Sequence, residues 1–365
     1  MSIQKLVIDG YRAIDHFEYE PNMINVLVGR SETGKSSILE AIAIAYTAPT
    51  GFLDRLGTNV LERIVEEKGW EPGYLVRVNG ERKGFRIVTV REGVEVSVRA
   101  LYEKDGTSVP ESVKELVAEY CAGKRSEEPV VFLVGGERQE IGESPAGEEC
   151  VTEVLGGPLL HGQVSPSYIC FAVLPAEKKV LTGVSVPSDL IFYDSQPGGK
   201  PDTKHLYDIS LPTGWINPVL GHLRRHVPHF DDLRSDGRTL WVHFEGQQPL
   251  PLSATGDGFR ESVRLMLASS LVPGGVFIVD GFGNLHPFLA ETVAEWFAMA
   301  ALKGRTQIFI STQDLEFIEK LLESGGELVN LFRLFRIRDE LAYEVLSYGE
   351  ALEELDELRL DLRGP

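Results

Sequence analysis

Three features are scarce in this chain of 365 residues: cysteine, long apolar runs and positive charge. The three cysteines, Cys121, Cys150 and Cys170, lie far apart without C-x-x-C spacing, which argues against a disulfide framework or a zinc knuckle and is typical of a reducing compartment. No segment approaches the ~20 consecutive apolar residues of a membrane span, and the first residues lack a signal-peptide core. We therefore expect a cytoplasmic protein with no membrane partner.

Positive charge is scarce because 36 lysine and arginine residues face 55 aspartate and glutamate residues, a formal net charge of −19. Such a chain repels phosphate backbones on average, which disfavours nucleic acid unless a local basic patch exists. The best candidate patch surrounds Arg224 and Arg225, and a solvated helix face explains it equally well. His222 and His226, spaced at i, i+4, place two metal ligands on one helix face, but no recognisable motif supplies a third.

The strongest positive signal is a phosphate-binding loop between an apolar strand at 23–28 and a helical pattern from Ser37. Glycines let successive backbone N–H groups face one point, and the new helix aims its positive end there. Lys35 reaches the outer phosphates and Ser36 offers a hydroxyl to Mg²⁺. The motif G-x-x-x-x-G-K-[ST] consists of Gly29, Arg30, Ser31, Glu32, Thr33, Gly34, Lys35 and Ser36. We expect ATP and Mg²⁺ as cofactors, with contacts from this loop and Ser37.

The last third of the chain carries a second half-site. Residues 276–279 are apolar and are followed by Asp280, the form of a Walker B strand whose aspartate holds Mg²⁺. Any buried parallel strand that ends in Asp matches this pattern, so the pattern alone does not identify a metal site. It supports one here because a phosphate-binding loop precedes it in the chain. We expect Asp280 and Ser36 to share the metal.

Apolar strands alternate with helices in the last third, which predicts a parallel core sheet. Alternating strands between 74 and 101 predict an added antiparallel β region, and a helix is expected at 53–68. We divide the chain into N-terminal strands and phosphate loop at 1–50, a β-rich insertion with helices at 51–250, and the rest of the core at 251–365. The fold class is α/β.

Several segments together resemble the ABC-type ATPase heads of the SMC, RecF and OLD-like families. Residues 6–14 resemble their opening strand and aromatic-Arg turn, 29–42 their Walker A loop and helix, 252–258 their signature loop, 276–287 their Walker B and D-loop, and 311–313 their switch strand. The resemblance covers both ends of the chain. Residues 52–251 match only as a generic β-rich insertion.

The resemblance implies a P-loop NTPase head with a helical signature lobe. Two such heads dimerise face to face, so Ser253 and Gly256 would contact the nucleotide of a partner copy, and Arg12 would touch it too. An ordinary capped helix also explains the Ser/Gly-rich segment. A protein effector, DNA-related or defence-related, would be the partner of an ATP-driven dimerisation switch.

The chain departs from this family at the residues of hydrolysis. Gly281 stands where a glutamate positions the attacking water, and Gln313 stands at the switch histidine. Loss of a positioned base costs about 10²–10⁴ in rate, so we expect slow turnover that Gly281→Glu would speed. Gln313 is kept as a catalytic candidate and Gln139 as a metal ligand. Other replacements considered are Gln196, Asp314 and Glu316.

Two alternative functions remain open at this stage. One is an interaction module that binds a nucleotide without hydrolysing it, and the other is the ATPase subunit of an ABC transporter. The segment at 252–258 lacks the L-S-G-G-Q form, which weighs against the transporter. We expect no coiled coil and no nuclease domain.

Overall fold

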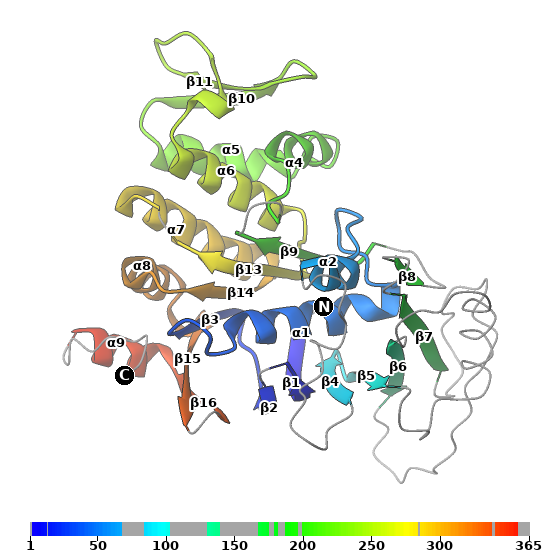
Figure 1. The fold of residues 1–365 in the computed structure, drawn as a ribbon. Helices are drawn as coiled ribbons and strands as arrows, with labels where there is room; N and C mark the ends of the chain where they lie inside the picture. The colour runs from blue at the N-terminus through cyan, green and yellow to red at the C-terminus, as the bar shows by residue number, and fades with distance from the viewer. Residues whose placement is uncertain are drawn as a thin grey trace.

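A six-stranded sheet forms the centre of the molecule, in the order β16-β15-β3-β14-β13-β9 (Figure 1). The computed structural model describes residues 2–12, 14–67, 84–102, 130–138, 167–174, 179–181, 187–195, 199–283, 285–337 and 340–356. The neighbouring strands from β15 to β9 pair in parallel, and β16 adds an antiparallel edge. The strands are β3 (Ile24–Gly29), β9 (Leu190–Asp194), β13 (Val276–Phe282), β14 (Gln307–Thr312), β15 (Val329–Ile337) and β16 (Glu340–Leu346). The predicted parallel core sheet is confirmed.

A second, wholly antiparallel sheet has the order β2-β1-β4-β5-β6-β7-β8. Its strands are β1 (Ile3–Tyr11), β2 (Ile14–Tyr19), β4 (Gly84–Arg91), β5 (Val94–Tyr102), β6 (Val130–Arg138), β7 (Ser167–Leu174) and β8 (Lys179–Leu181). The predicted antiparallel region is confirmed at 84–102, whereas the part of that prediction at 74–83 lies outside the described residues. The sheet also contains the first two strands of the chain. By contrast, β9 lies within the span 51–250 but joins the parallel sheet.

Helices cover both faces of the parallel sheet. On one face α1 (Lys35–Thr47) and α2 (Val60–Glu67) share a core with β1 and β4, so nearly every residue of α1 is buried. On the other face a second core contains α4 (Thr203–Ser210), α5 (Ile216–His226), α6 (Asp257–Ser270), α7 (Pro287–Gly304) and α8 (Leu315–Gly325). In β3 the side chains alternate between these cores, Leu27 in the first and Val26 and Val28 in the second.

The remaining described elements are short. A small antiparallel sheet of β10 (Phe230–Ser235), β11 (Leu240–Phe244) and β12 (Leu250–Pro251) leads through the 3₁₀ turn η5 (Leu252–Ala254) into α6. The other 3₁₀ turns are η1 (Ala48–Thr50) and η6 (Gly326–Leu328), and α9 (Tyr348–Asp356) packs beside β15. Among the described residues, no helix combines the length and apolarity that crossing a bilayer requires.

The helix expected at 53–68 begins later, at Val60. Asp54 Oδ1 accepts hydrogen bonds from the backbone N–H groups of Leu56 (2.9 Å) and Thr58 (2.8 Å). Gly57 has a φ of 78°, and Leu53 pairs with Asn59 in an isolated bridge. An aspartate side chain that bonds its own following backbone competes with helix formation, so these residues form a turn instead.

Candidate functional site

The loop between β3 and α1 folds as a cradle around the Lys35 ammonium. Lys35 Nζ donates hydrogen bonds to the carbonyl oxygens of Gly29 (2.8 Å) and Arg30 (2.7 Å). Gly29 has a φ of 148°, and a Cβ there would lie 2.4 Å from the carbonyl oxygen of Leu334 on β15. Gly34 adopts a φ of 100° immediately before α1. Both glycines of the motif are therefore required by the backbone.

The other loop residues divide by exposure. Arg30, Ser31 and Ser36 are exposed, whereas Thr33 and Ser37 are buried. Thr33 Oγ1 donates to the carbonyl oxygen of Arg30 at 2.9 Å and so closes the loop from inside. The exposed members face solvent at the loop, where a phosphate would bind, and the buried ones maintain its shape.

Asp280 on β13 lies against this loop. The Ser36 hydroxyl lies near the Asp280 carboxyl and acts to lower its pKa, and Ser311 Oγ at the end of β14 donates to Asp280 Oδ1 at 2.5 Å. The backbone N–H of Gly281 donates to the same Ser311 Oγ at 2.8 Å. Because β14 lies between β3 and β13, Ser311 bridges the strand that leads into the loop and the strand that carries the acid. Two of the three residues that the sequence assigned to Mg²⁺, Ser36 and Asp280, thus lie near each other.

Burial shifts the pKa values of the two charged groups of the site, Asp280 and Lys35, toward their neutral forms. Burial raises the pKa of Asp280, and the neighbouring Asp194 raises it further, while Ser311, Ser36 and Lys35 act in the opposite direction. Burial likewise lowers the pKa of Lys35, which Asp280 opposes. Asp194 is the direct neighbour of Asp280 across the β9–β13 pair. Two acids at one sheet edge suit a divalent cation.

The Walker B strand contains a bulge at Gly281. Val279 pairs with Ile310 and Phe282 with Thr312, so β13 has one more residue than β14 in this interval. Gly281 has a φ of 80°, and a Cβ there would lie 2.3 Å from Ser195 Oγ. A glutamate is therefore strained on this backbone. The expectation that Gly281→Glu would speed hydrolysis required an intact strand geometry, and the bulge does not meet that condition.

Gln313 follows β14 and reaches the phosphate loop. Its Nε2 donates to the carbonyl oxygen of Gly29 at 3.4 Å, the same oxygen that Lys35 contacts. Glu32, the acid inside the loop, has a φ of 66° and is exposed, and its carbonyl oxygen accepts from Arg336 Nε at 3.1 Å. The loop is thus held from β14 on one side and β15 on the other. Asp314 caps α8, accepting from the Phe317 N–H at 3.1 Å, and His286 caps α7.

Arg12 lies in the turn between β1 and β2, with a φ of 48°. Its guanidinium forms an ion pair with Glu40, a residue of α1 that is 4% exposed. The Tyr11 hydroxyl donates to the same Glu40 oxygen at 3.0 Å. Burial lowers the pKa of Arg12, but Glu40 outweighs this and leaves the pKa raised, with a smaller contribution in the same direction from Asp280. Arg12 is thus fixed near the site by an acid that the sequence did not single out.

Ser253 and Gly256 are not brought to the phosphate loop of their own chain. They precede α6, which packs on the opposite face of the parallel sheet from α1. Both are exposed, and the space beside Gly256 Cα is open. A Cβ at Gly258 would lie 3.2 Å from Leu289 of α7, so the start of α6 lies beside the helix that follows the Walker B strand.

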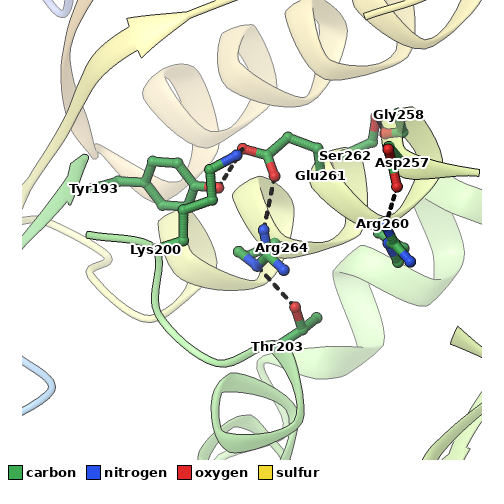
Figure 2. Close-up of polar contacts among 9 residues, drawn as sticks. All are labelled: Tyr193, Lys200, Thr203, Asp257, Gly258, Arg260, Glu261, Ser262 and Arg264. Atoms are coloured by element: carbon green, nitrogen blue, oxygen red, sulfur yellow. Dashed lines mark hydrogen bonds and ion pairs between the residues drawn. The ribbon is translucent and has the colours of Figure 1, made fainter. Parts of the chain in front are cut away.

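A polar network ties α6 to β9 (Figure 2). Glu261 of α6 accepts from the Tyr193 hydroxyl, from Lys200 Nζ at 3.0 Å and from Arg264 at 2.7 Å. Arg264 also donates to Thr203 Oγ1 at 2.9 Å. Tyr193 immediately precedes Asp194, the neighbour of Asp280. The helix α6 is therefore connected through one strand to the sheet edge that carries Asp194 and Asp280.

The remaining predicted residues lie apart or cannot be placed. Arg224 contacts the carbonyl oxygen of Asp231 and, at 3.5 Å, the carboxylate of Asp232, and Arg225 contacts the carbonyl oxygen of Gly221, so local acceptors engage both members of the basic patch. Gln139 and Gln196 lie outside the described residues. The strand before Gln139, β6, belongs to the antiparallel sheet and lies near the C-terminal end of α1 in Figure 1. The strand β9 ends two residues before Gln196, and its last residue pairs with Asp280.

Sequence reasoning missed Glu40, Asp194 and Ser311. The last two follow or end apolar strands that the sequence did predict, and a polar residue at the carboxyl end of a parallel strand is the signal that points to them. Glu40 has no such signal, because its partner Arg12 lies 28 residues earlier.

Comparisons with known proteins give a partial likeness. No family model matches the chain. A 114-residue segment, 30% of the chain, is 27% identical to an uncharacterized protein of Methanocaldococcus jannaschii, covering 99% of that protein. In structure the chain is similar to an SMC head domain from Thermotoga maritima, with 11% identity over 95% of this chain and 100% of that one and a TM-score of 0.46. It is also similar to an SMC head bound to the C-terminal domain of ScpA, derived from Pyrococcus furiosus, with 10% identity, 98% and 99% coverage and a TM-score of 0.47. The P-loop NTPase-like fold class itself follows from the strand order and loop described above.

Proposed function

We propose that this chain binds Mg-ATP at the loop Gly29–Ser36 and acts as an ATP-driven dimerisation switch with slow hydrolysis. The observation that carries the proposal is that the helix-start hydroxyl of Ser36 lies near the partly buried carboxyl of Asp280, beside the loop whose carbonyl groups hold Lys35. Mg²⁺ held by these two oxygens would sit next to the phosphates cradled by the loop.

The contacts of the Lys35 side chain also support ATP binding at this loop. Its ammonium contacts loop carbonyls, acceptors weaker than a phosphate, and burial lowers its pKa. A phosphate oxygen would provide a charged partner in the same cradle and offset the cost of burying the ammonium. Mg²⁺ would likewise stabilise the charge of Asp280, whose pKa burial raises.

Slow hydrolysis follows from the groups near Asp280. The bulge places Gly281 where no carboxylate fits, and Gln313, an amide, is the switch-strand side chain that reaches the loop. An amide orients water but does not accept its proton as a carboxylate or imidazole does. A module that retains ATP without hydrolysing it is the other outcome that these groups favour.

The dimerisation part rests on the exposed start of α6. The start of α6 is exposed, and the backbone N–H groups of a helix start attract an anion. The phosphate loop of the same chain leads into α1, which lies on the opposite face of the parallel sheet from α6. A second copy would bring its Ser253 and Gly256 to the γ-phosphate. A protein effector stays a prediction from the sequence.

Calorimetric titration with Mg-ATP tests the proposal. We expect wild-type binding that Lys35→Ala abolishes, with Lys303→Ala, an exposed lysine at the end of α7, as the matched control. Phosphate release measured beside ATP retention then separates slow hydrolysis from none. Unchanged ATP affinity in Lys35→Ala would overturn the site assignment.

A further inference from the structure

Two histidines of α5 face the helix α7. His222 and His226 lie one helical turn apart, and their rings stack with centroids 4.2 Å apart. His222 is 2% exposed and also contacts the ring of Trp296 on α7. The sequence alone indicated two candidate metal ligands here and no third.

The helix α7 supplies a third candidate metal ligand beside the two histidines. Glu295 Oε2 lies 2.8 Å from His226 Nδ1. One ligand atom from each of His222, His226 and Glu295 can be chosen so that all three lie within 4.8 Å of one another, a cluster of metal-binding side chains within the described part of the chain. Ligands at ~2.0–2.2 Å from one tetrahedral ion lie about 3.4 Å apart, so the three side chains would draw closer together to share one ion.

The hydrogen bond of His222 orients its ring for this role. His222 Nε2 lies 2.8 Å from the carbonyl oxygen of Thr292. A carbonyl only accepts, so Nε2 carries the proton and the lone pair is on Nδ1. Metal-binding histidines are commonly fixed in this way by a carbonyl or carboxylate on the other ring nitrogen.

We propose that His222, His226 and Glu295 bind a divalent transition-metal ion of the zinc class, with water as the fourth ligand. Two imidazoles and one carboxylate suit Zn²⁺ or Co²⁺ better than Mg²⁺ or Ca²⁺, which prefer oxygen donors. The half-exposed side of the cluster, His226 at 29% and Glu295 at 36% side-chain exposure, leaves room for that water and a path for the ion. The ion would tie α5 to α7, and the site is separate from the proposed nucleotide site.

Cobalt titration of the full chain tests this proposal. We expect the visible absorption of tetrahedral Co²⁺ at one equivalent, unaffected by millimolar Mg²⁺ and displaced by Zn²⁺. Glu295→Gln keeps a hydrogen-bond acceptor for His226, so it tests the ligand without removing the helix contact, and His226→Ala removes a second ligand. Each change should weaken Co²⁺ binding at least tenfold. His205→Ala, an exposed histidine of α4, is the matched control and should bind as wild type does.

Thermal unfolding gives an independent readout. Zn²⁺ should raise the midpoint of wild type and the control but not of Glu295→Gln, since an ion that binds only the folded state stabilises it. Circular dichroism verifies that each variant is folded. Absence of cobalt absorption in wild type, or absorption that survives both ligand changes, would overturn the proposal and leave a His–Glu ion pair only.

Discussion

Ser36 and Asp280, 244 positions apart, lie together at the carboxyl-terminal edge of the parallel sheet, where the Ser36 hydroxyl acts to lower the pKa of the Asp280 carboxyl. The strands that place them, β3 and β13, are not neighbours, because β14 lies between them and contributes Ser311 to the same carboxylate. This arrangement puts a hydroxyl and a carboxylate on one site, where a six-coordinate ion would take an oxygen from each.

Asp280→Asn should separate the metal contribution from the phosphate contribution. The amide keeps a hydrogen-bond acceptor for Ser311 but loses the charge that attracts Mg²⁺. We expect wild-type ATP affinity to rise with Mg²⁺ and the affinity of the variant to be nearly independent of it. Calorimetry with ATP in Mg²⁺ and in EDTA measures both. An equal Mg²⁺ effect in the two proteins would remove Asp280 from the metal site.

Gly281→Glu should destabilise the protein and leave hydrolysis no faster. A side chain at a φ of 80° costs ~1–3 kcal/mol, and its Cβ would also meet Ser195 Oγ. Gly283→Glu, two residues on at an open position, is the matched control. Urea unfolding and phosphate release are the measurements. Faster hydrolysis in Gly281→Glu at unchanged stability would show that the bulge relaxes in solution.

The core of the candidate site could be predicted from the sequence because its signals are local. The phosphate loop consists of eight consecutive residues, and Asp280 follows four consecutive apolar residues, 276–279, that by themselves predict a buried strand. The bulge was not visible, because a glycine in place of a glutamate looks like a simple substitution until the pairing of β13 with β14 is known. Local hydrogen bonds can also override a helical pattern, as Asp54 does ahead of α2.

Contacts between residues far apart in the chain were the other feature that the sequence did not predict. Glu40 lies within a helix that the sequence did predict, but nothing in its neighbourhood announces that it is buried against Arg12. The third ligand for His222 and His226 was missed for the same reason, since Glu295 comes from a helix about 70 residues later. Both contacts depend on which elements pack together in the fold, and the periodicity of the sequence does not specify that packing.

Glu40→Ala should be strongly destabilising, by about 3–5 kcal/mol, because it leaves the partly buried Arg12 charge without its partner. The double variant Arg12→Ala/Glu40→Ala should recover part of that loss, since no uncompensated charge remains. Glu66→Ala on α2, an exposed acid, controls for the loss of one carboxylate. Urea unfolding of wild type, the single variants Arg12→Ala and Glu40→Ala and the double variant gives the coupling energy. Additive effects of the two changes would mean that the pair is not an energetic unit.

ATP, and not ADP, should promote a two-fold dimer, because only ATP offers the γ-phosphate to the start of α6. Ser253→Arg places a bulky side chain at that contact and should leave a monomer in both nucleotides. Gln248→Arg, exposed before β12 in the same lobe, is the matched control. Light scattering with each nucleotide decides the matter. A dimer that ignores the Ser253 change would place the interface elsewhere.

Asp54→Asn should stabilise the protein at neutral pH and lose that advantage in acid. Burial raises the pKa of Asp54 to about 6 from 3.8, although the N–H groups of Thr58 and Leu56 act against the rise. The folded state therefore binds more protons than the unfolded chain between these values, so the contribution of Asp54 is favourable at low pH and is lost as pH rises through about 6.

Because one pKa unit corresponds to about 1.4 kcal/mol, charging Asp54 in the folded protein costs on the order of 3 kcal/mol at pH 7. Asparagine keeps the oxygen that accepts from Leu56 and Thr58 and carries no charge, so we expect a gain of about 1–3 kcal/mol at pH 7 that shrinks toward zero near pH 4. Urea unfolding at both pH values measures it, with Glu66→Gln controlling for the change in net charge. A gain that is the same at both pH values would mean that Asp54 is solvated in the folded protein and that the turn ahead of α2 opens to water.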